Sequence, residues 1–181
     1  MAGVAVKNEY FGAPSDAAAA DLVQAGPGGP LPVSPPLQEA LRTRDREALR
    51  LAMRPKVRSS GSGVLVLATT GIDPVIQMST LEALLTGEHY DVISRRPRAG
   101  HVIAERGQGQ ALVVTLTDEL QAALAATPRD QIIAAAAPWS HDEEWHGRAD
   151  PEALSYFLVE LADLARQAGQ RGERLYCWIC L

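Results

Sequence analysis

The chain has 181 residues, of which 46% are hydrophobic and 22% are charged, as in an ordinary folded protein and unlike a disordered one. Its formal net charge of −5 argues against nucleic acid as the main partner, because phosphate binding requires a concentrated positive field. No apolar run approaches the roughly 20 residues that span a bilayer, and the first residues lack the core of a signal peptide. We therefore expect a single cytoplasmic domain with reduced cysteines and no membrane association.

The first third of the chain predicts a strand, a helix and a long excursion. Residues 4–11 have the β-branched and aromatic character of a strand, and Ser15 or Asp16 can cap the alanine-rich helix that follows. Residues 26–63 are rich in proline, glycine and basic side chains, with an amphipathic pattern over 37–53. We interpret this segment as a flexible excursion from the domain that carries one helix.

The ordered core is expected to resume at residues 64–68, a continuous apolar run typical of a buried strand. Asp73 precedes a proline and can cap a helix that ends at Gly87, a residue that readily takes the left-handed conformation. Residues 102–105 and 111–116 then predict two strands joined by a glycine-containing hairpin. Such a hairpin indicates a sheet that is at least partly antiparallel.

The last third predicts three helices and a terminal strand. Thr117 and Thr127 each precede acidic residues and mark helix starts, whereas residues 138–149 are polar, aromatic and expected to be irregular. Residues 151–169 form the clearest amphipathic helix of the chain, and 174–181 follow as an aromatic strand. The predicted fold is therefore α+β, with helices packed on a mixed or mainly antiparallel sheet. The apolar stripe of the long helix comprises Leu154, Phe157, Leu158, Leu161, Leu164, Ala165 and Ala168.

Four stretches of the chain occur in a recognisable order: Tyr10-Phe11, the helix from Ile72-Asp73 to Gly87, the strand-to-helix turn Val113–Leu120, and the C-terminal run from Leu158 to Ile179. Their order resembles the YfbM-like family of bacterial domains of unknown function, in a distant, actinobacterial-type form. The resemblance implies an α+β domain but brings no established activity, cofactor or functional residue. The proline- and glycine-rich segment departs from the family pattern.

The densest group of chemically capable side chains lies in residues 139–146. Two imidazoles, three carboxylates and two indoles occur there within eight residues. Such groups can bind a divalent metal or pair a histidine base with a carboxylate. His141 and His146 are five residues apart and would not share a helix face, whereas Asp142 and His146 are four apart and could. The candidate binding residues are Trp139, His141, Asp142, Glu144, Trp145 and His146.

Two further interpretations of this cluster stay open. The tryptophans can anchor a solvated loop by packing back onto the domain, or they can form the centre of an interface with a protein partner. The sequence does not decide between them.

Cys177 and Cys180 form a C-x-x-C spacing, but no helix follows to lower a thiol pKa. On a strand, two residues three apart point to opposite faces and cannot form a disulfide without bending the chain. We therefore interpret both as structural thiols.

Two basic stretches could contact nucleic acid or an acidic partner, but each has a simpler interpretation as solvated surface. In the first, Asp45 and Glu47 interrupt the run and can form ion pairs along a helix. In the second, over residues 95–98, no aromatic side chains alternate with the arginines to stack on bases. The first stretch comprises Arg42, Arg44, Arg46, Arg50, Arg54, Lys56 and Arg58.

These features favour a non-enzymatic domain that binds a protein partner, as an immunity-like or accessory protein. The alternative is a metal-assisted hydrolase or a small-ligand-binding enzyme that uses the 139–146 cluster. We predict no cofactor, no resident metal, no catalytic residue, and a monomer or small homo-oligomer.

Overall fold

A six-stranded sheet runs through the molecule in the order β2-β3-β1-β6-β5-β4, and every neighbouring pair is antiparallel. The computed structural model describes residues 7–24, 39, 42–43, 55–60, 63–147 and 149–180. The two central strands come from opposite ends of the chain, since β1 pairs with β6 from Lys7↔Cys180 to Ala13↔Arg174. The strands are β1 Lys7–Ala13, β2 Val57–Ser59, β3 Leu65–Thr70, β4 Val102–Arg106, β5 Ala111–Thr115 and β6 Arg174–Cys180.

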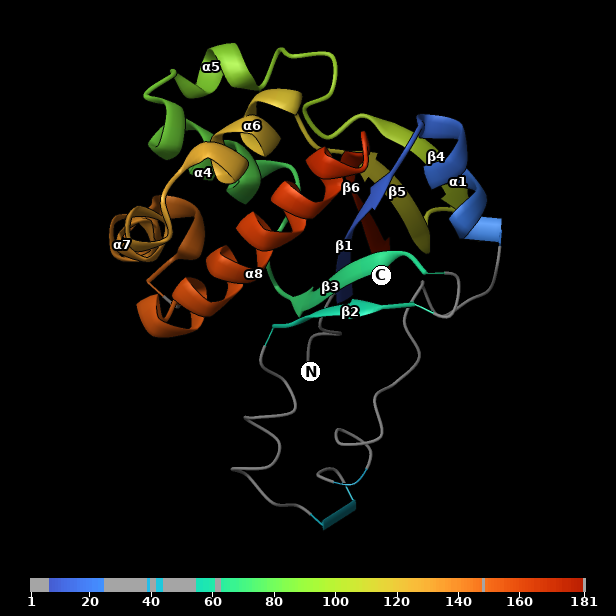
Figure 1. Ribbon diagram of the computed structural model, residues 1–181, viewed down its shortest axis with the longest axis horizontal. Coiled ribbons are helices and arrows are strands. Elements are labelled where there is room, and N and C mark those ends of the chain that lie inside the picture. The colour runs from blue at the N-terminus through green and yellow to red at the C-terminus, as the bar shows by residue number, and fades with distance from the viewer. Residues whose placement is uncertain are drawn as a thin grey trace.

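Helices cover the two faces of this sheet unequally (Figure 1). The helices α4, α6, α7 and α8 pack on one face, and α1 lies against the other. The short α5 leads from α4 toward the β4–β5 hairpin. The helices are α1 Asp16–Gln24, α4 Ile76–Thr86, α5 Tyr90–Ile93, α6 Asp118–Ala126, α7 Arg129–Ser140 and α8 Pro151–Gln170, with a 3₁₀ turn at Glu143–Trp145.

Side chains that alternate along the central strands supply both cores. Tyr10 and Cys177 point toward α8 and its neighbours, whereas Phe11 and Trp178 point toward α1. All four are at most 1% exposed. The two innermost strands are thus buried on both faces, and the sequence prediction of an α+β fold with a C-terminal helix and terminal strand is confirmed.

Four of the helix starts predicted from the sequence have a side-chain cap. The start predicted at Thr127 does not, because α7 begins after Pro128 without a side-chain cap and the Thr127 hydroxyl donates to the Ala123 carbonyl at the end of α6. Oxygens of Ser15, Asp73, Thr117 and Asp150 accept hydrogen bonds from backbone N–H groups two or three residues later, at 2.7 to 3.1 Å. Gly87 ends α4 at φ +73°, and its N–H donates to the carbonyl of Ala83 at 2.9 Å.

Within the described residues, no helix is long and apolar enough to cross a membrane.

Part of the predicted excursion belongs to the sheet. Val57–Ser59 form the edge strand β2, in register with Leu65–Leu67 of β3. The Val57 side chain packs on the core between the sheet and helices α4, α6, α7 and α8, here called the helix-side core. The sequence prediction that all of 26–63 leaves the domain is therefore wrong for these residues. Most of the predicted loop 26–36 and helix 37–53 lies outside the described residues, among which Glu39, Arg42 and Thr43 are helical.

The predicted irregular segment 138–149 is also corrected at its start. Helix α7 continues through Pro138 to Ser140. A proline inside a helix removes one backbone hydrogen bond. Burial of the next side chain, Trp139, in the helix-side core offsets that loss, because a buried indole contributes a large apolar area.

Candidate functional site

The two tryptophans of the 139–146 cluster lie in the core. Trp139 is 1% exposed and Trp145 is 9% exposed. Their rings meet edge to face with centroids 5.0 Å apart, and Trp139 also stacks on Phe157 of α8. The Trp139 Nε1 donates to the hydroxyl of Thr80 in α4 at 3.1 Å. Of the interpretations left open by the sequence, this packing agrees with anchoring of the segment onto the domain.

The polar residues of the cluster hold the turn between α7 and α8. His141 Nδ1 lies 2.7 Å from the carbonyl oxygen of Ala137, one turn back in α7. Asp142 accepts from the backbone N–H of Glu144 at 3.1 Å and so caps the 3₁₀ turn. His146 is exposed and ends that turn at φ +50°.

These side chains do not converge. Across the described parts of the chain, no three His, Cys, Asp or Glu side chains come close enough together to hold a metal ion. The arrangement therefore lends no support to the alternative in which His141, Asp142, Glu144 and His146 act together on a metal.

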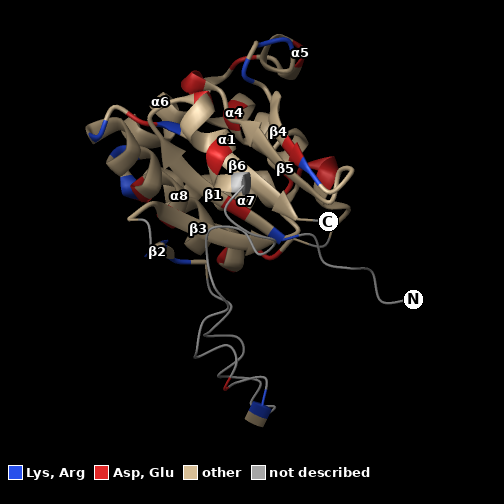
Figure 2. Ribbon diagram, turned by 90° about the vertical axis from the view of Figure 1, so that its right-hand side faces the viewer, with Lys and Arg blue, Asp and Glu red and all other residues tan. Residues whose placement is uncertain are grey.

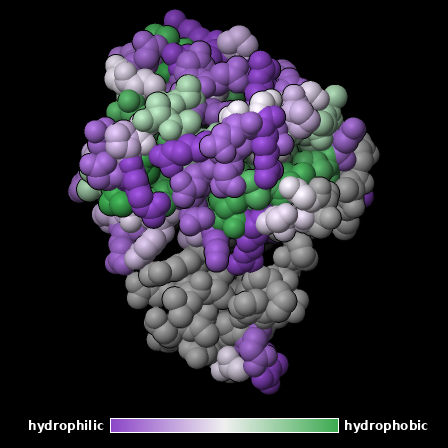
Figure 3. Space-filling view, viewed as in Figure 1, coloured by the Kyte–Doolittle hydropathy of each residue, from purple (hydrophilic) through white to green (hydrophobic). Residues whose placement is uncertain are grey.

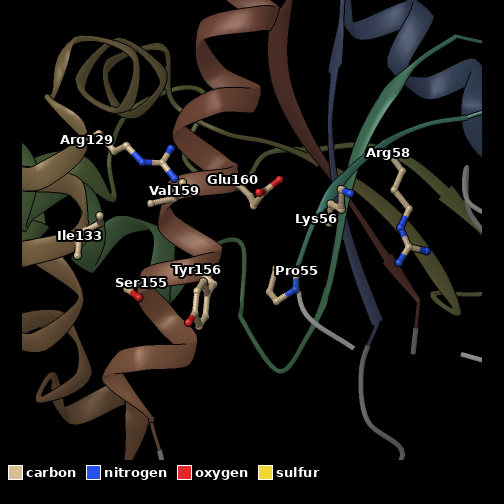
Figure 4. A pocket seen from close by; sticks show the side chains of 9 residues that line it. All are labelled: Pro55, Lys56, Arg58, Arg129, Ile133, Ser155, Tyr156, Val159 and Glu160. Atoms are coloured by element: carbon tan, nitrogen blue, oxygen red, sulfur yellow. The ribbon is translucent and has the colours of Figure 1, made fainter. Parts of the chain in front are cut away.

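A groove of about 360 Å³ lies elsewhere, between the edge strand β2 and the helices α7 and α8. In Figure 4, Arg129 reaches from α7 toward α8, Glu160 projects toward β2, and Lys56 stands on the strand side. The apolar wall includes Ile133 and Tyr156, which are 45% and 37% exposed. The lining residues are Pro55, Lys56, Arg58, Arg129, Ile133, Ser155, Tyr156, Val159 and Glu160.

The charges of this groove are mostly positive. Its one lining carboxylate, Glu160, accepts the backbone N–H of Val57 at 2.8 Å and thereby covers an outward-facing donor of the sheet edge. Arg129 lies 3.7 Å from Asp163, a long and exposed ion pair. Lys56 and Arg58 form no ion pair with any residue that the structure describes. The groove therefore presents cations beside an apolar wall.

The sequence pattern does not predict this groove. The basic run ending at Arg58 was a signal for Lys56 and Arg58, but nothing in the spacing relates them to residues 129–133 or 155–160. The missing information is the position of β2, which places the basic residues opposite α8.

A second polar cluster joins α1 to β6. Arg98, whose side chain is 15% exposed, lies over the Tyr176 ring with its guanidinium carbon 5.1 Å from the centroid. Arg98 Nη1 and the Tyr176 hydroxyl both donate to Asp16 Oδ1, each at 2.8 Å. The hydrogen bonds from Tyr176 and Arg98 lower the pKa of Asp16, whereas burial and the bond to Asp16 raise the pKa of Tyr176. The Asp16 carboxylate therefore links α1 to β6.

A buried carboxylate on α4 organises the neighbouring segment. Glu82 is 1% exposed, forms an ion pair with Arg96 and accepts a hydrogen bond from the Thr117 hydroxyl. Arg96 also reaches Glu88 at 2.9 Å. Two of the three arginines in the 95–98 stretch thus point inward, so this stretch is not a basic surface patch.

The cysteines behave as predicted. Cys177 lies in the helix-side core and Cys180 packs against the core on the α1 side, and both are free thiols. Burial raises the pKa of Cys177 well above its ordinary value, so the thiol stays protonated at neutral pH. The predicted placement of the two residues on opposite faces of the sheet is confirmed, and Cys177 is buried whereas Cys180 is partly exposed.

No protein-family model matches this chain, and neither a curated protein nor a solved structure is significantly similar to it. The resemblance to the YfbM-like domains therefore stays a prediction.

Proposed function

We propose that this chain is a non-enzymatic binding domain that recognises a protein partner through the surface formed by β2, α7 and α8. The observation that carries the proposal is the groove, where exposed Ile133 and Tyr156 stand beside Lys56 and Arg129. Aromatic side chains and arginine are enriched at the centres of protein interfaces. An immunity-like or accessory role, in the cytoplasm, fits a domain of this kind.

Two views show how apolar and charged residues are distributed over the surface. On the face seen in Figure 3, hydrophobic residues form small separate patches surrounded by hydrophilic ones. Acidic and basic positions are interspersed over the side seen in Figure 2. A stable interface buries at least about 1,000 Å² in total, so the partner would also contact the helix surfaces that flank the groove.

Quantitative affinity capture from the lysate of the source cells tests the proposal. We expect Ile133→Glu combined with Tyr156→Ser to lower the recovery of specific partners by at least about tenfold, as loss of an aromatic anchor does. The matched control is Val92→Glu with Val102→Ser, which changes two side chains that are 51% and 46% exposed and lie away from the groove.

Recovery of the same proteins at the same abundance with all three baits would contradict the proposal. Circular dichroism and thermal unfolding of each bait check that the substituted chains are folded. Because Trp139 and Trp145 are buried, their substitution would test the core and not the docking surface.

A further inference from the structure

We propose that the groove between β2 and α8 selects an acidic segment of the partner, in which a carboxylate side chain lies next to an apolar one. This inference rests on the proposed function, since it names what the docking surface recognises.

The charge of the groove is opposite to that of the chain. The protein has 17 Lys and Arg against 22 Asp and Glu, yet the groove is lined by three cations and one carboxylate. That carboxylate, Glu160, is engaged by the Val57 N–H. A concentration of one sign in a concave surface attracts the opposite sign and disfavours partners of like charge.

The cations of the groove are available to a ligand. Arg129 is 65% exposed, and Asp163, its only ion-pair partner among the described residues, is also held by Arg166 at 2.7 Å. Exposed ion pairs at such distances contribute at most about 1 kcal/mol, so a carboxylate of the partner can compete for Arg129. Lys56 is exposed on the opposite wall.

The apolar wall of the groove selects the apolar side chain of the partner segment. Ile133, Tyr156 and Val159 line the groove from α7 and α8, with Val159 almost wholly buried. A volume of about 360 Å³ is at the small end of the range of ligand sites, so a short segment fits and a folded element does not. An apolar side chain of that segment would cover Ile133 and Tyr156 while its neighbouring carboxylate meets the cations.

The edge strand β2 indicates that the partner segment is recognised through its side chains and not through its backbone. A peptide that added a strand to β2 would need the outward N–H of Val57, which Glu160 already occupies at 2.8 Å. Side-chain charge and the apolar contact are therefore expected to carry the selectivity.

Titration of the ¹⁵N-labelled chain by NMR tests this inference with three probes. These are the blocked peptides Glu-Leu-Glu-Leu-Glu and Lys-Leu-Lys-Leu-Lys, and inorganic phosphate. We expect the acidic peptide to saturate shifts at β2 and around Tyr156, and the basic peptide to leave them unchanged. Added salt should lower the affinity of the acidic peptide for the protein, because exposed charges are screened over about 10 Å at 0.1 M salt.

Two charge-matched variants locate the effect. Lys56→Glu with Arg129→Glu is expected to raise the Kd of the acidic peptide by at least about tenfold. The control, Arg95→Glu with Arg171→Glu, makes the same change in net charge at exposed positions outside the groove and should change Kd by less than about twofold. Lys56→Arg with Arg129→Lys should retain binding.

Three results would overturn the inference. They are absence of saturation by the acidic peptide, an equal loss of affinity in the two charge-reversed variants, and phosphate saturating the same amides with the same Kd. If any of them occurs while affinity capture still depends on Ile133 and Tyr156, the acidic selectivity is wrong and the docking surface stands. If the peptide binds as expected but capture does not depend on these residues, the docking proposal fails.

Discussion

Asp16 is the residue that connects the first helix of the chain to its last strand. Its carboxylate receives hydrogen bonds from both Arg98 and Tyr176 at 2.8 Å, and it stands at the first position of α1, where a negative charge also complements the helix dipole. These contacts stabilise the ionised form. The linkage between α1 and β6 is therefore sensitive to acid.

We predict that Asp16→Asn destabilises the protein at neutral pH and not at low pH. Because the pKa of Asp16 lies below its ordinary value of 3.8, its contribution is fully present above that value and is lost as the pH falls through the lowered pKa. The carboxylate is half exposed, so the loss at pH 7 is expected to be at most about 1 kcal/mol.

Urea unfolding of the wild type and Asp16→Asn between pH 7 and about pH 2 measures this difference. Asp21→Asn, in the same helix, is the control. A difference that is constant over the whole range would contradict the assignment of Asp16 as the titrating group.

At the scale of residues, the sequence identifies which side chains could act but not which way they point. Trp139 and Trp145 have the composition of an interface centre. Only the fold shows that the two indoles pack against each other and that Trp139 stacks on Phe157 of α8. Asp73 is the opposite case. Its place before a proline predicted a cap, and its carboxylate does accept two backbone N–H groups, because capping depends on neighbours in sequence alone.

At the scale of elements, Thr117 joins α6 to α4. Its hydroxyl caps α6 by accepting the N–H of Leu120 at 3.1 Å and donates to the buried carboxylate of Glu82. One hydroxyl thus accepts a hydrogen bond from a free N–H group at the start of α6 and donates a hydrogen bond to a buried carboxylate.

We predict that Thr117→Val lowers the free energy of unfolding by about 2–4 kcal/mol, the sum of a lost helix cap and a lost hydrogen bond to a buried carboxylate. Thr117→Ser keeps the hydroxyl and should cost much less. Thr70→Val, at the exposed end of β3, is the control for the change in side-chain chemistry. Urea denaturation at pH 7 measures all three, and equal stability of the Val and Ser variants at position 117 would contradict the dual role.

Elements with local signals are predictable here, and those defined by distant pairing are not. The long amphipathic pattern and the Asp150 cap identify α8 to within one or two residues of its observed end. By contrast, β2 has only three residues and no periodicity of its own. It becomes a strand because Leu65–Leu67 offer it a partner and because Val57 reaches the core, and neither cause can be read from residues 57–59 alone.

At the scale of the whole molecule, the groove brings together three segments that are separate in the sequence, residues 55–58, 129–133 and 155–160. Lys56 comes from the sheet edge, Arg129 and Ile133 from α7, and Tyr156 and Glu160 from α8. The sheet order brings these walls together, since β2 lies at the edge of the sheet beside α8. A surface of this kind is a property of topology, which is why the sequence directed attention to the adjacent 139–146 segment and not to it.

Site-specific photo-cross-linking in the source cells tests most directly whether this surface is where the protein binds its partner. A benzophenone amino acid is placed at Ile133, which lines the groove, or at Val92, a similarly exposed apolar position on α5. If the partner binds at the groove, we expect a discrete cross-linked protein from position 133 and none from position 92. A cross-link of equal yield from both positions, or from position 92 alone, would contradict it.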